Sequence, residues 1–359
     1  MGSSSKSMLL PFNMPPVAKG GMLGMLQSAG GGGGAANNWY AELARKTLTD
    51  GEASVVQTEQ FTTTENLMYL ASFEGTGTSD AFLEFNDNAS ADYSNRDGTV
   101  SRDTNQALGL RLAQGTTDPM FSYGYIRNIS DDTKLVMGYT IEENGTGNTE
   151  PDCQLYSGKW NITDEQINQL ALTRASDNFE NDSQIVALGT NYDGQSNNNY
   201  WELLGSAKTT GGASSLEVTS LANKRYYWIQ FYCEASTDLV CQLSESDTFD
   251  TGTNYNQRYV YNGSYSGSTG RSNLEMTQSA DCYSNMLICN ISGKPKLIIN
   301  NSALQNIANT QNDKITFGKW TETEVMDGFR VFKSGQTLDA NSTIICTPSS
   351  TIIRGIPLK

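Results

Sequence analysis

The chain repeats itself at a spacing of about 160 residues. The tripeptide Gly-Lys-Trp ends at Trp160 and again at Trp320, and Asn-Ile-Ser begins at Asn128 and again at Asn290, followed each time by Lys-Leu. Weaker matches in the same order pair Tyr93 and Arg96 with Tyr255 and Arg258, and Tyr40, Glu42 and Leu43 with Tyr200, Glu202 and Leu203. We therefore expect two copies of one fold of roughly 150–160 residues.

Within each copy, the apolar residues follow the period of β-strands. Leu108, Leu110 and Leu112 alternate with less apolar residues, as expected for a strand with one buried face. The segment from Tyr226 to Cys233 is almost continuously aromatic or β-branched, which is typical of a strand buried on both faces. The composition agrees, because 34 Gly, only 8 Pro and 18% charged residues suit many short strands joined by tight turns.

These patterns predict an all-β fold with two tandem, duplicated antiparallel β-sandwiches, jelly-roll-like in type, preceded by an extended N-terminal arm. The expected boundaries are 1–38 for the arm, 39–197 for the first sandwich and 198–359 for the second, with a short C-terminal tail. The only helical candidates are 164–169 and 302–308, and both are short.

The arm has apolar side chains in a segment too rich in Gly and Pro to form a core of its own. Five consecutive glycines, 30–34, separate its apolar part from the first sandwich. Its methionines suit an adaptable docking surface. We predict that the arm binds another subunit or partner through Leu9, Leu10, Phe12, Met14, Met22, Leu23, Met25 and Leu26.

Charge and residue types exclude several classes of function. The net charge is −15, with acidic residues dispersed along the chain, so binding to a phosphate backbone is not expected. No segment approaches the roughly 20 apolar residues that cross a bilayer, and the first residues do not read as a signal peptide. Histidine is absent, which removes His-based catalysis and His metal sites. The six cysteines contain no CxxC motif and are expected to be reduced, buried thiols.

Acidic residues could support glycoside hydrolysis if two carboxylates met across a cleft. The candidates are Glu142 with Glu143, Asp131 with Asp132, and Glu322 with Glu324, all among turn-forming residues. We interpret them as solvated surface groups and expect neither catalytic residues nor a cofactor. Loops around Asp87 and Asp92, or Asp247 and Asp250, suit calcium by composition but lack EF-hand spacing, so no metal site is predicted.

Sugar binding is the more serious binding hypothesis, because β-sandwiches often stack sugar rings on exposed aromatic side chains. The chain has 17 Tyr and 5 Trp. Tyr259 and Tyr261, in a stretch rich in Gly, Ser and Asn, are spaced to share one face of a strand and are candidate glycan-binding residues. The alternative is that they pack on the sandwich or on a neighbouring subunit. Trp160 and Trp320 occupy the same position of the repeat in the two copies, and we assign them to the common core.

The repeated unit resembles modules of virion proteins from tailed bacteriophages. The resemblance runs from about Trp39 to Pro348 and rests on the aromatic-Glu-Leu start, Asn-Ile-Ser with Lys-Leu, and Gly-Lys-Trp. It implies a structural accessory protein of the virion, attached to the capsid surface or tail through the arm, present in multiple copies or as a homo-oligomer, and bound to other virion proteins. The alternative is a glycan-binding adhesin or receptor-binding tail protein that meets host-surface glycans.

Overall fold

The computed structural model describes residues 40–97, 102–106, 108–115, 117–189, 201, 204–209, 212–233, 238–277, 281–305, 311–333, 335–338 and 342–348. Every regular element in these ranges is a β-strand, and every strand pairing is antiparallel, which confirms the predicted all-β class. The predicted arm, residues 1–38, and its eight apolar candidates lie outside the described residues.

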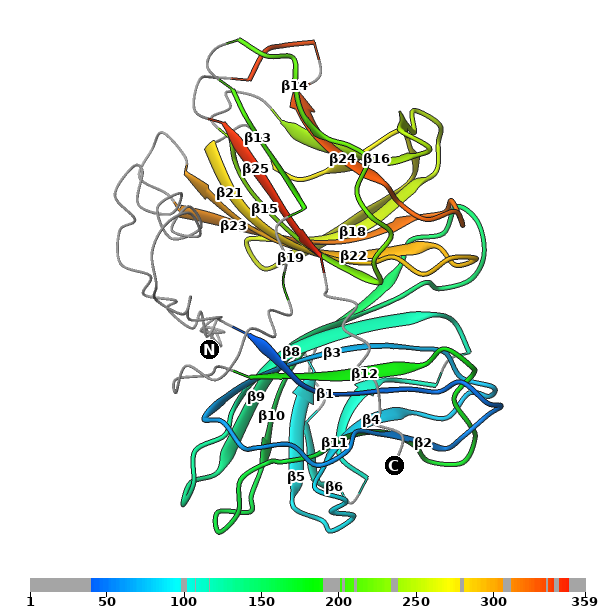
Figure 1. Cartoon of the computed structure of the whole chain (residues 1–359), viewed down its shortest axis with the longest axis vertical. Coiled ribbons are helices and arrows are strands. Elements are labelled where there is room, and N and C mark those ends of the chain that lie inside the picture. Colours follow the sequence, from blue (N-terminus) through cyan, green and yellow to red (C-terminus); the bar gives the residue numbers. More distant parts are fainter. Residues whose placement is uncertain are drawn as a thin grey trace, which may run out of the picture.

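The strands up to residue 189 form a unit of two sheets (Figure 1). The large sheet has the order β1-β12-β3-β8-β9-β10-β5-β6, and the small sheet has the order β2-β11-β4-β7. Their bounds are β1 Ala41–Thr47, β2 Val55–Gln57, β3 Asn66–Phe73, β4 Ala81–Phe85, β5 Tyr93–Asp97, β6 Arg102–Gln106, β7 Leu110–Ala113, β8 Met120–Arg127, β9 Lys134–Glu142, β10 Asp152–Trp160, β11 Leu170–Arg174 and β12 Gln184–Gly189.

The strands from residue 205 form a second unit of two sheets. The large sheet has the order β13-β25-β15-β21-β22-β23-β18-β19, and the small sheet has the order β14-β24-β16-β17, with β20 also paired to β16. Their bounds are β13 Gly205–Lys208, β14 Ser215–Val218, β15 Tyr226–Cys233, β16 Leu239–Glu245, β17 Thr248–Phe249, β18 Tyr255–Tyr261, β19 Ser264–Arg271, β20 Leu274–Glu275, β21 Asp281–Cys289, β22 Lys296–Gln305, β23 Gln311–Trp320, β24 Gly328–Lys333 and β25 Thr343–Pro348.

The repeated tryptophans occupy matching places in the two units. Trp160 ends β10 opposite Tyr93 on β5, and Trp320 ends β23 opposite Tyr255 on β18. Each indole is fully buried and stacks on its tyrosine, with ring centroids 6.3 and 6.2 Å apart. Both rings belong to the core between the large and small sheets of their unit, as predicted.

The repeated Asn-Ile-Ser and Lys-Leu motifs hold loops in place. Asn128 donates to the carbonyls of Thr64 and Ile167 and accepts from the amide of Ile167, and Asn290 makes the corresponding bonds around Met326. The Lys134 and Lys296 side chains are buried, and each ammonium group donates to backbone carbonyls of nearby loops. These polar residues satisfy buried backbone groups in otherwise irregular segments.

Both helical expectations are wrong. Residues 164–169 form a bend and an irregular segment, because the Asn86 and Asn128 side chains bond the backbone groups of the successive residues 166–169. Residues 302–305 continue β22, where the partners on β21 and β23 supply a hydrogen-bonding ladder that overrides a weak local helical pattern. Residues 306–308 lie outside the described part of the chain.

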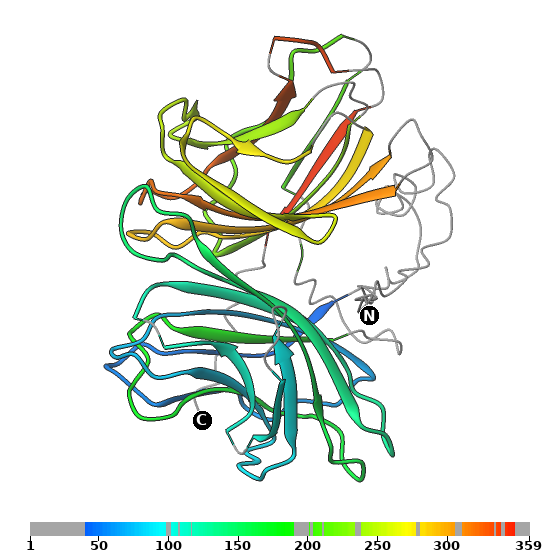
Figure 2. The ribbon, with the colours of Figure 1, turned by 180° about the vertical axis from the view of Figure 1, so that it is seen from behind.

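The two large sheets face each other across the centre of the molecule (Figures 1 and 2). The molecule therefore has four layers, with a small sheet on each outside. β3 is buried at every residue after its first, because alternate side chains face either its own sandwich core or the other unit.

Candidate docking surface

An apolar layer, called the seam below, joins the two large sheets. The first unit contributes Met68, Leu70, Phe121, Tyr123, Ile141, Val186 and Leu188, and the second contributes Tyr226, Leu287, Cys289, Leu297, Ile299 and Phe317. All thirteen side chains are buried. Burial of each of the larger side chains stabilises the contact between the sheets by on the order of 1.5–3 kcal/mol before entropy costs are considered. The two units therefore form one body.

Polar contacts cross the edges of the seam. The Ser72 and Tyr226 hydroxyls are 2.8 Å apart, and the Asn301 amide donates to the Tyr123 hydroxyl at 2.7 Å. The Lys294 ammonium lies 2.5 Å from the Glu74 carboxylate. These contacts fix the register of the two sheets, because an apolar layer alone allows them to slide.

Two cations of the second unit hold the acidic hairpin end, residues 143–152, between β9 and β10. Lys319 donates to the carbonyls of Glu143 and Gly145 at 2.9 and 3.0 Å and to the Thr149 hydroxyl at 2.8 Å. Arg258 forms an ion pair with Asp152 and lies 3.6 Å from the Glu150 carboxylate. The hairpin end rises beside the second unit in both ribbon views (Figures 1 and 2).

The conformation of the hairpin end depends on Gly145 and Gly147, which have φ angles of 77° and 81°. The Cβ atom of any other residue is disfavoured in this left-handed region, so glycine allows the tight turn. Burial lowers the pKa of Lys319, although the nearby Glu143 and Asp118 oppose that shift. The three hydrogen bonds replace the water that the ammonium group loses on burial.

The first unit has cations at the same register positions. Ser157 on β10 is opposite Arg96 on β5, just as Phe317 on β23 is opposite Arg258 on β18. Lys159 precedes the buried Trp160, as Lys319 precedes Trp320. The matched positions along the neighbouring strands are Leu135 with Leu297, Met137 with Ile299, Tyr125 with Leu287, and Arg127 with Cys289.

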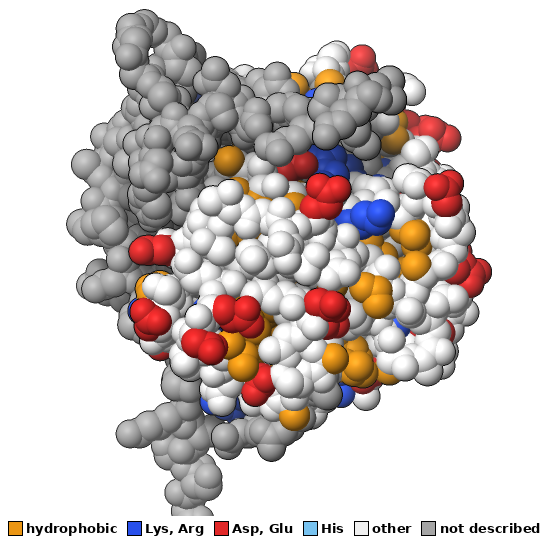
Figure 3. Space-filling view, turned by 60° about the horizontal axis from the view of Figure 1, so that its bottom comes forward, with side chains coloured by type: hydrophobic (Ala, Val, Ile, Leu, Met, Phe, Trp, Pro, Cys, Tyr) orange, Lys and Arg blue, Asp and Glu red, His pale blue; other side chains and the backbone are white. Residues whose placement is uncertain are grey.

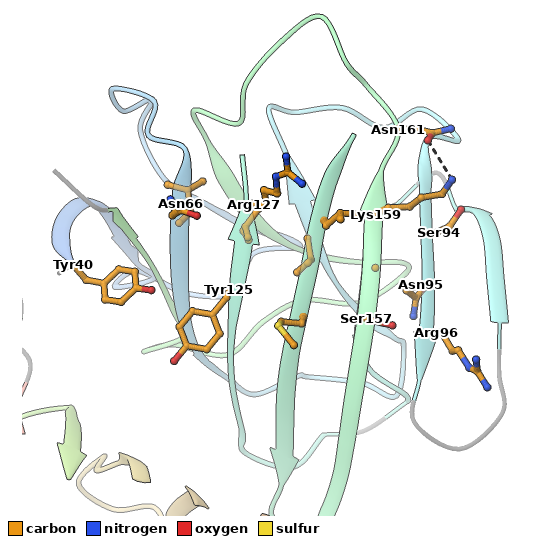
Figure 4. A pocket seen from close by; sticks show the side chains of 16 residues that line it. Tyr40, Asn66, Ser94, Asn95, Arg96, Tyr125, Arg127, Ser157, Lys159 and Asn161 are labelled. Atoms are coloured by element: carbon orange, nitrogen blue, oxygen red, sulfur yellow. Dashed lines mark hydrogen bonds between the residues drawn. The ribbon is translucent and has the colours of Figure 1, made fainter. Parts of the chain in front are cut away.

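These positions of the first unit line an open hollow of about 830 Å³ on the face of the large sheet (Figure 4). Tyr40 and Tyr125 lie at one end, while Lys159 and Asn161 lie at the other, joined by a hydrogen bond of 3.3 Å. Arg96 and Lys159 are exposed, and Leu135 is 49% exposed where its counterpart Leu297 is 2% exposed. The hollow is therefore exposed at its Leu135 and Lys159 end, where the second unit has a covered surface, while Tyr40 and Tyr125 at its other end pack against the seam.

The hollow is locally cationic in an acidic protein. Arg96, Arg127 and Lys159 line it, and no carboxylate is among its lining residues. Arg127 lies 3.4 Å from Asp132, and both side chains of this ion pair are about half exposed. On the face seen in Figure 3, acidic side chains are spread over the surface among side chains of other types. A cationic, partly apolar surface of this kind suits an acidic protein partner.

The two tyrosines predicted to bind glycans share one face of β18. Tyr259 is half-buried, and the Lys314 ammonium lies 4.3 Å from the centre of its ring. Tyr261 is partly buried and packs against the sandwich core. The more exposed tyrosine of this region is Tyr265 on β19, which is 48% exposed.

The three acidic pairs named from the sequence belong to separate loops or strand ends. Asp132 pairs with Arg127, and its carbonyl accepts from Lys134. The Glu143 carbonyl accepts from Lys319, and burial raises the pKa of the Glu143 carboxyl group. The Glu322 carboxylate accepts from the Asn254 amide. Within the described ranges, no three His, Cys, Asp or Glu side chains gather as metal ligands, and no helix is long and apolar enough to span a membrane.

Comparisons with known proteins leave the family open. No family model and no curated protein matches the chain. Similar solved structures include the attachment invasion locus protein Ail of Yersinia pestis, with 8% identity over 74% of this chain and 99% of that chain and a TM-score of 0.11. The transport unit of the autotransporter AIDA-I from Escherichia coli has 10% identity over 72% of this chain and 91% of that chain, with a TM-score of 0.13.

Proposed function

We propose that the chain is a structural accessory protein of a tailed-phage virion, without catalytic activity, that attaches to the capsid surface or tail through residues 1–38. The observation that carries the proposal is the seam, because it joins two sandwiches into one rigid body. Such a body suits a component that is built into a larger assembly. Tyr40, the first described residue, packs against the seam, and the predicted arm precedes it in the sequence.

We infer that the two units are tandem duplicated jelly rolls with the boundaries expected from the sequence. In the first unit, four strands lie in the order β1-β12-β3-β8 and four in the order β2-β11-β4-β7, so the chain wraps back and forth between two sheets. The second unit repeats this order with β13-β25-β15-β21 and β14-β24-β16-β20. Added strands extend each large sheet. Jelly rolls of this kind are common in viral capsid and lectin domains.

Attachment through the arm is tested by deleting residues 1–34. Tagged full-length and truncated chains are supplied during phage production, and the copies per purified particle are counted by mass spectrometry. We expect the truncated chain to keep its unfolding midpoint and to fall at least tenfold in occupancy. Equal occupancy would place the attachment in the sandwiches, and absence of the full-length chain from particles would reject the virion role.

The second candidate is a glycan-binding adhesin, which the exposed ring of Tyr265 on β19 favours. Jelly rolls also occur in lectins. On a glycan array, this candidate predicts binding that is lost in Tyr265→Ala, Tyr259→Ala or Tyr261→Ala, with the unfolding midpoint unchanged in Tyr265→Ala. No binding by the folded full-length chain would count against it.

A further inference from the structure

We propose that the exposed end of the hollow, formed by Arg96, Lys159 and Leu135, binds an acidic turn of another protein. The expected partner segment is a loop between two strands that presents carboxylates together with free backbone carbonyls. The proposal concerns a surface of the folded chain and does not depend on the virion role. The contact at the matching positions of the second unit supplies the template, because it shows what this pair of cations binds.

On the second unit, the matching cations bind the acidic hairpin end by two kinds of contact. Arg258 binds carboxylates, since it forms an ion pair with Asp152 and lies 3.6 Å from the Glu150 carboxylate. Lys319 binds neutral oxygens instead, and donates to two backbone carbonyls of the hairpin end at 2.9 and 3.0 Å. An arginine and a lysine in this register therefore recognise a turn that has carboxylates on one side and unpaired carbonyls on the other.

The first unit has the same pair of cations at the same register and leaves it exposed (Figure 4). Arg96 and Lys159 are both exposed, and among the described residues neither forms an ion pair with a carboxylate. The Lys159 ammonium donates to the Asn161 side chain at 3.3 Å, an exposed contact that a carboxylate or carbonyl can replace. Leu135 is opposite Lys159 on β9 and is 49% exposed. The surface therefore combines apolar and charged groups, as docking surfaces of proteins do.

The strand next to Arg96 adds to the positive charge of this end of the hollow. Position 102 on β6 is opposite Arg96 in register and is also an arginine, whereas Gly267 is opposite Arg258 in the second unit. A Cβ atom at Gly267 would collide with the Glu150 carboxylate, so glycine makes room for the bound turn there. The first unit has a further cation in place of that room. We therefore expect a partner turn with at least as many carboxylates as the hairpin end.

The segments of this chain that could reach the hollow have the wrong charge. Residues 1–38 and 349–359 each contain two basic residues and no acidic one. Residues 305–312 of the second unit match the acidic hairpin end in the repeat, but they contain no carboxylate. The hairpin end itself is already bound by the cations of the second unit. A separate acidic protein is therefore the partner that fits the hollow.

A cyclised, fluorescent peptide with the sequence of residues 142–152 serves as the probe, because this sequence already binds the matching cations. Its binding to the full chain is measured by fluorescence anisotropy. We expect saturable binding that weakens as the salt concentration rises. Arg96→Glu and Lys159→Glu should each weaken it by about tenfold or more, as should replacement of Glu150 and Asp152 of the peptide by Gln and Asn.

Lys208→Glu is the matched control. Lys208 is exposed on β13 of the second unit, and its replacement changes the net charge by the same amount as either hollow variant. This variant should bind the peptide like the unmodified chain. All three variants should keep the unfolding midpoint, since the changed side chains are exposed.

Four results would overturn the proposal. The unmodified chain fails to bind the peptide, or the two hollow variants bind it as tightly as Lys208→Glu does. A scrambled linear peptide of the same composition that binds equally tightly would show that the hollow attracts negative charge without recognising a turn. Sedimentation velocity provides the fourth, because self-association of the unmodified chain that Arg96→Glu abolishes would assign the hollow to a second copy.

Discussion

Lys159 and Lys319 show how one residue type acquires different roles at matching positions of two similar sheets. Lys319 is fully buried in contact with the acidic hairpin end, while Lys159 is exposed at the rim of the hollow. The difference arises from what covers each sheet and not from the strands themselves. Sequence repetition locates both lysines, but only the packing of the two units distinguishes them.

Replacement of Lys319 by Met should lower the free energy of unfolding by about 2–4 kcal/mol, because buried carbonyls of Glu143 and Gly145 lose their charged donor. The matched change Lys159→Met should stay within about 0.5 kcal/mol of the unmodified chain, as is usual for exposed sites. Urea unfolding followed by circular dichroism measures both. Equal effects of the two changes would contradict the structural role assigned to Lys319.

At the scale of elements, the ends of β10 and β23 differ in one hydrogen bond. The Trp320 indole NH donates to the Asp250 carboxylate at 2.6 Å. Among the described residues, the Trp160 indole NH has no hydrogen-bond partner, although its ring is equally buried. The strand–loop contact at Asp250 therefore strengthens only the second unit.

Trp320→Phe should destabilise the protein more than Trp160→Phe does, by about 1.5–3 kcal/mol, which is the contribution of a hydrogen bond to a charged group. The phenyl ring keeps most of the core packing in both variants, so the comparison isolates the lost donor. Truncation to Ala should cost about 3–5 kcal/mol at either site. Thermal and urea unfolding of the four variants provide the values, and a larger loss for Trp160→Phe would refute this assignment.

The sequence predicts the strands and the core residues far better than it predicts the candidate surface. Period-two alternation identifies the strands, and repetition identifies the buried tryptophans, because both depend on local geometry. The seam depends on how two separate sheets fit together, and the alternation of apolar residues along a single strand does not indicate this fit. The sequence repetition identifies Arg96 and Arg258 as a pair. That Arg258 is partly buried while Arg96 is exposed follows from the docking of the hairpin end on the second unit. The wrong helix at 302–308 has the same origin, since neighbouring strands override a weak local preference.

At the scale of the whole molecule, the buried thiols determine how stability responds to pH. Burial raises the pKa of Cys289 to about 11 and that of Cys153, Cys282 and Cys346 to about 12, and it also raises those of Cys233 and Cys241. All six are free cysteines, and five of them lie in the second unit. Unfolded thiols release their protons near pH 8.5, so above that pH the unfolded chain binds fewer protons than the folded chain.

The contribution of these thiols to the free energy of unfolding should therefore be steady below about pH 8 and fall as the pH rises from about 8.5 toward 10, by roughly 1–2 kcal/mol per buried thiol at pH 10. Lys296 opposes this trend, because burial lowers its pKa to about 8 and the unfolded lysine holds its proton to higher pH. Burial also lowers the pKa of Lys134, Lys314 and Lys319, so four lysines act against six thiols. Urea unfolding at pH 7.5, 9 and 10 in the presence of a reductant measures the slope. Cys282→Ala should lower the overall stability yet reduce the pH dependence of the free energy of unfolding by the contribution of one thiol. If the slope is unchanged in this variant, or if stability does not fall by pH 10, these thiols do not govern the loss of stability at alkaline pH.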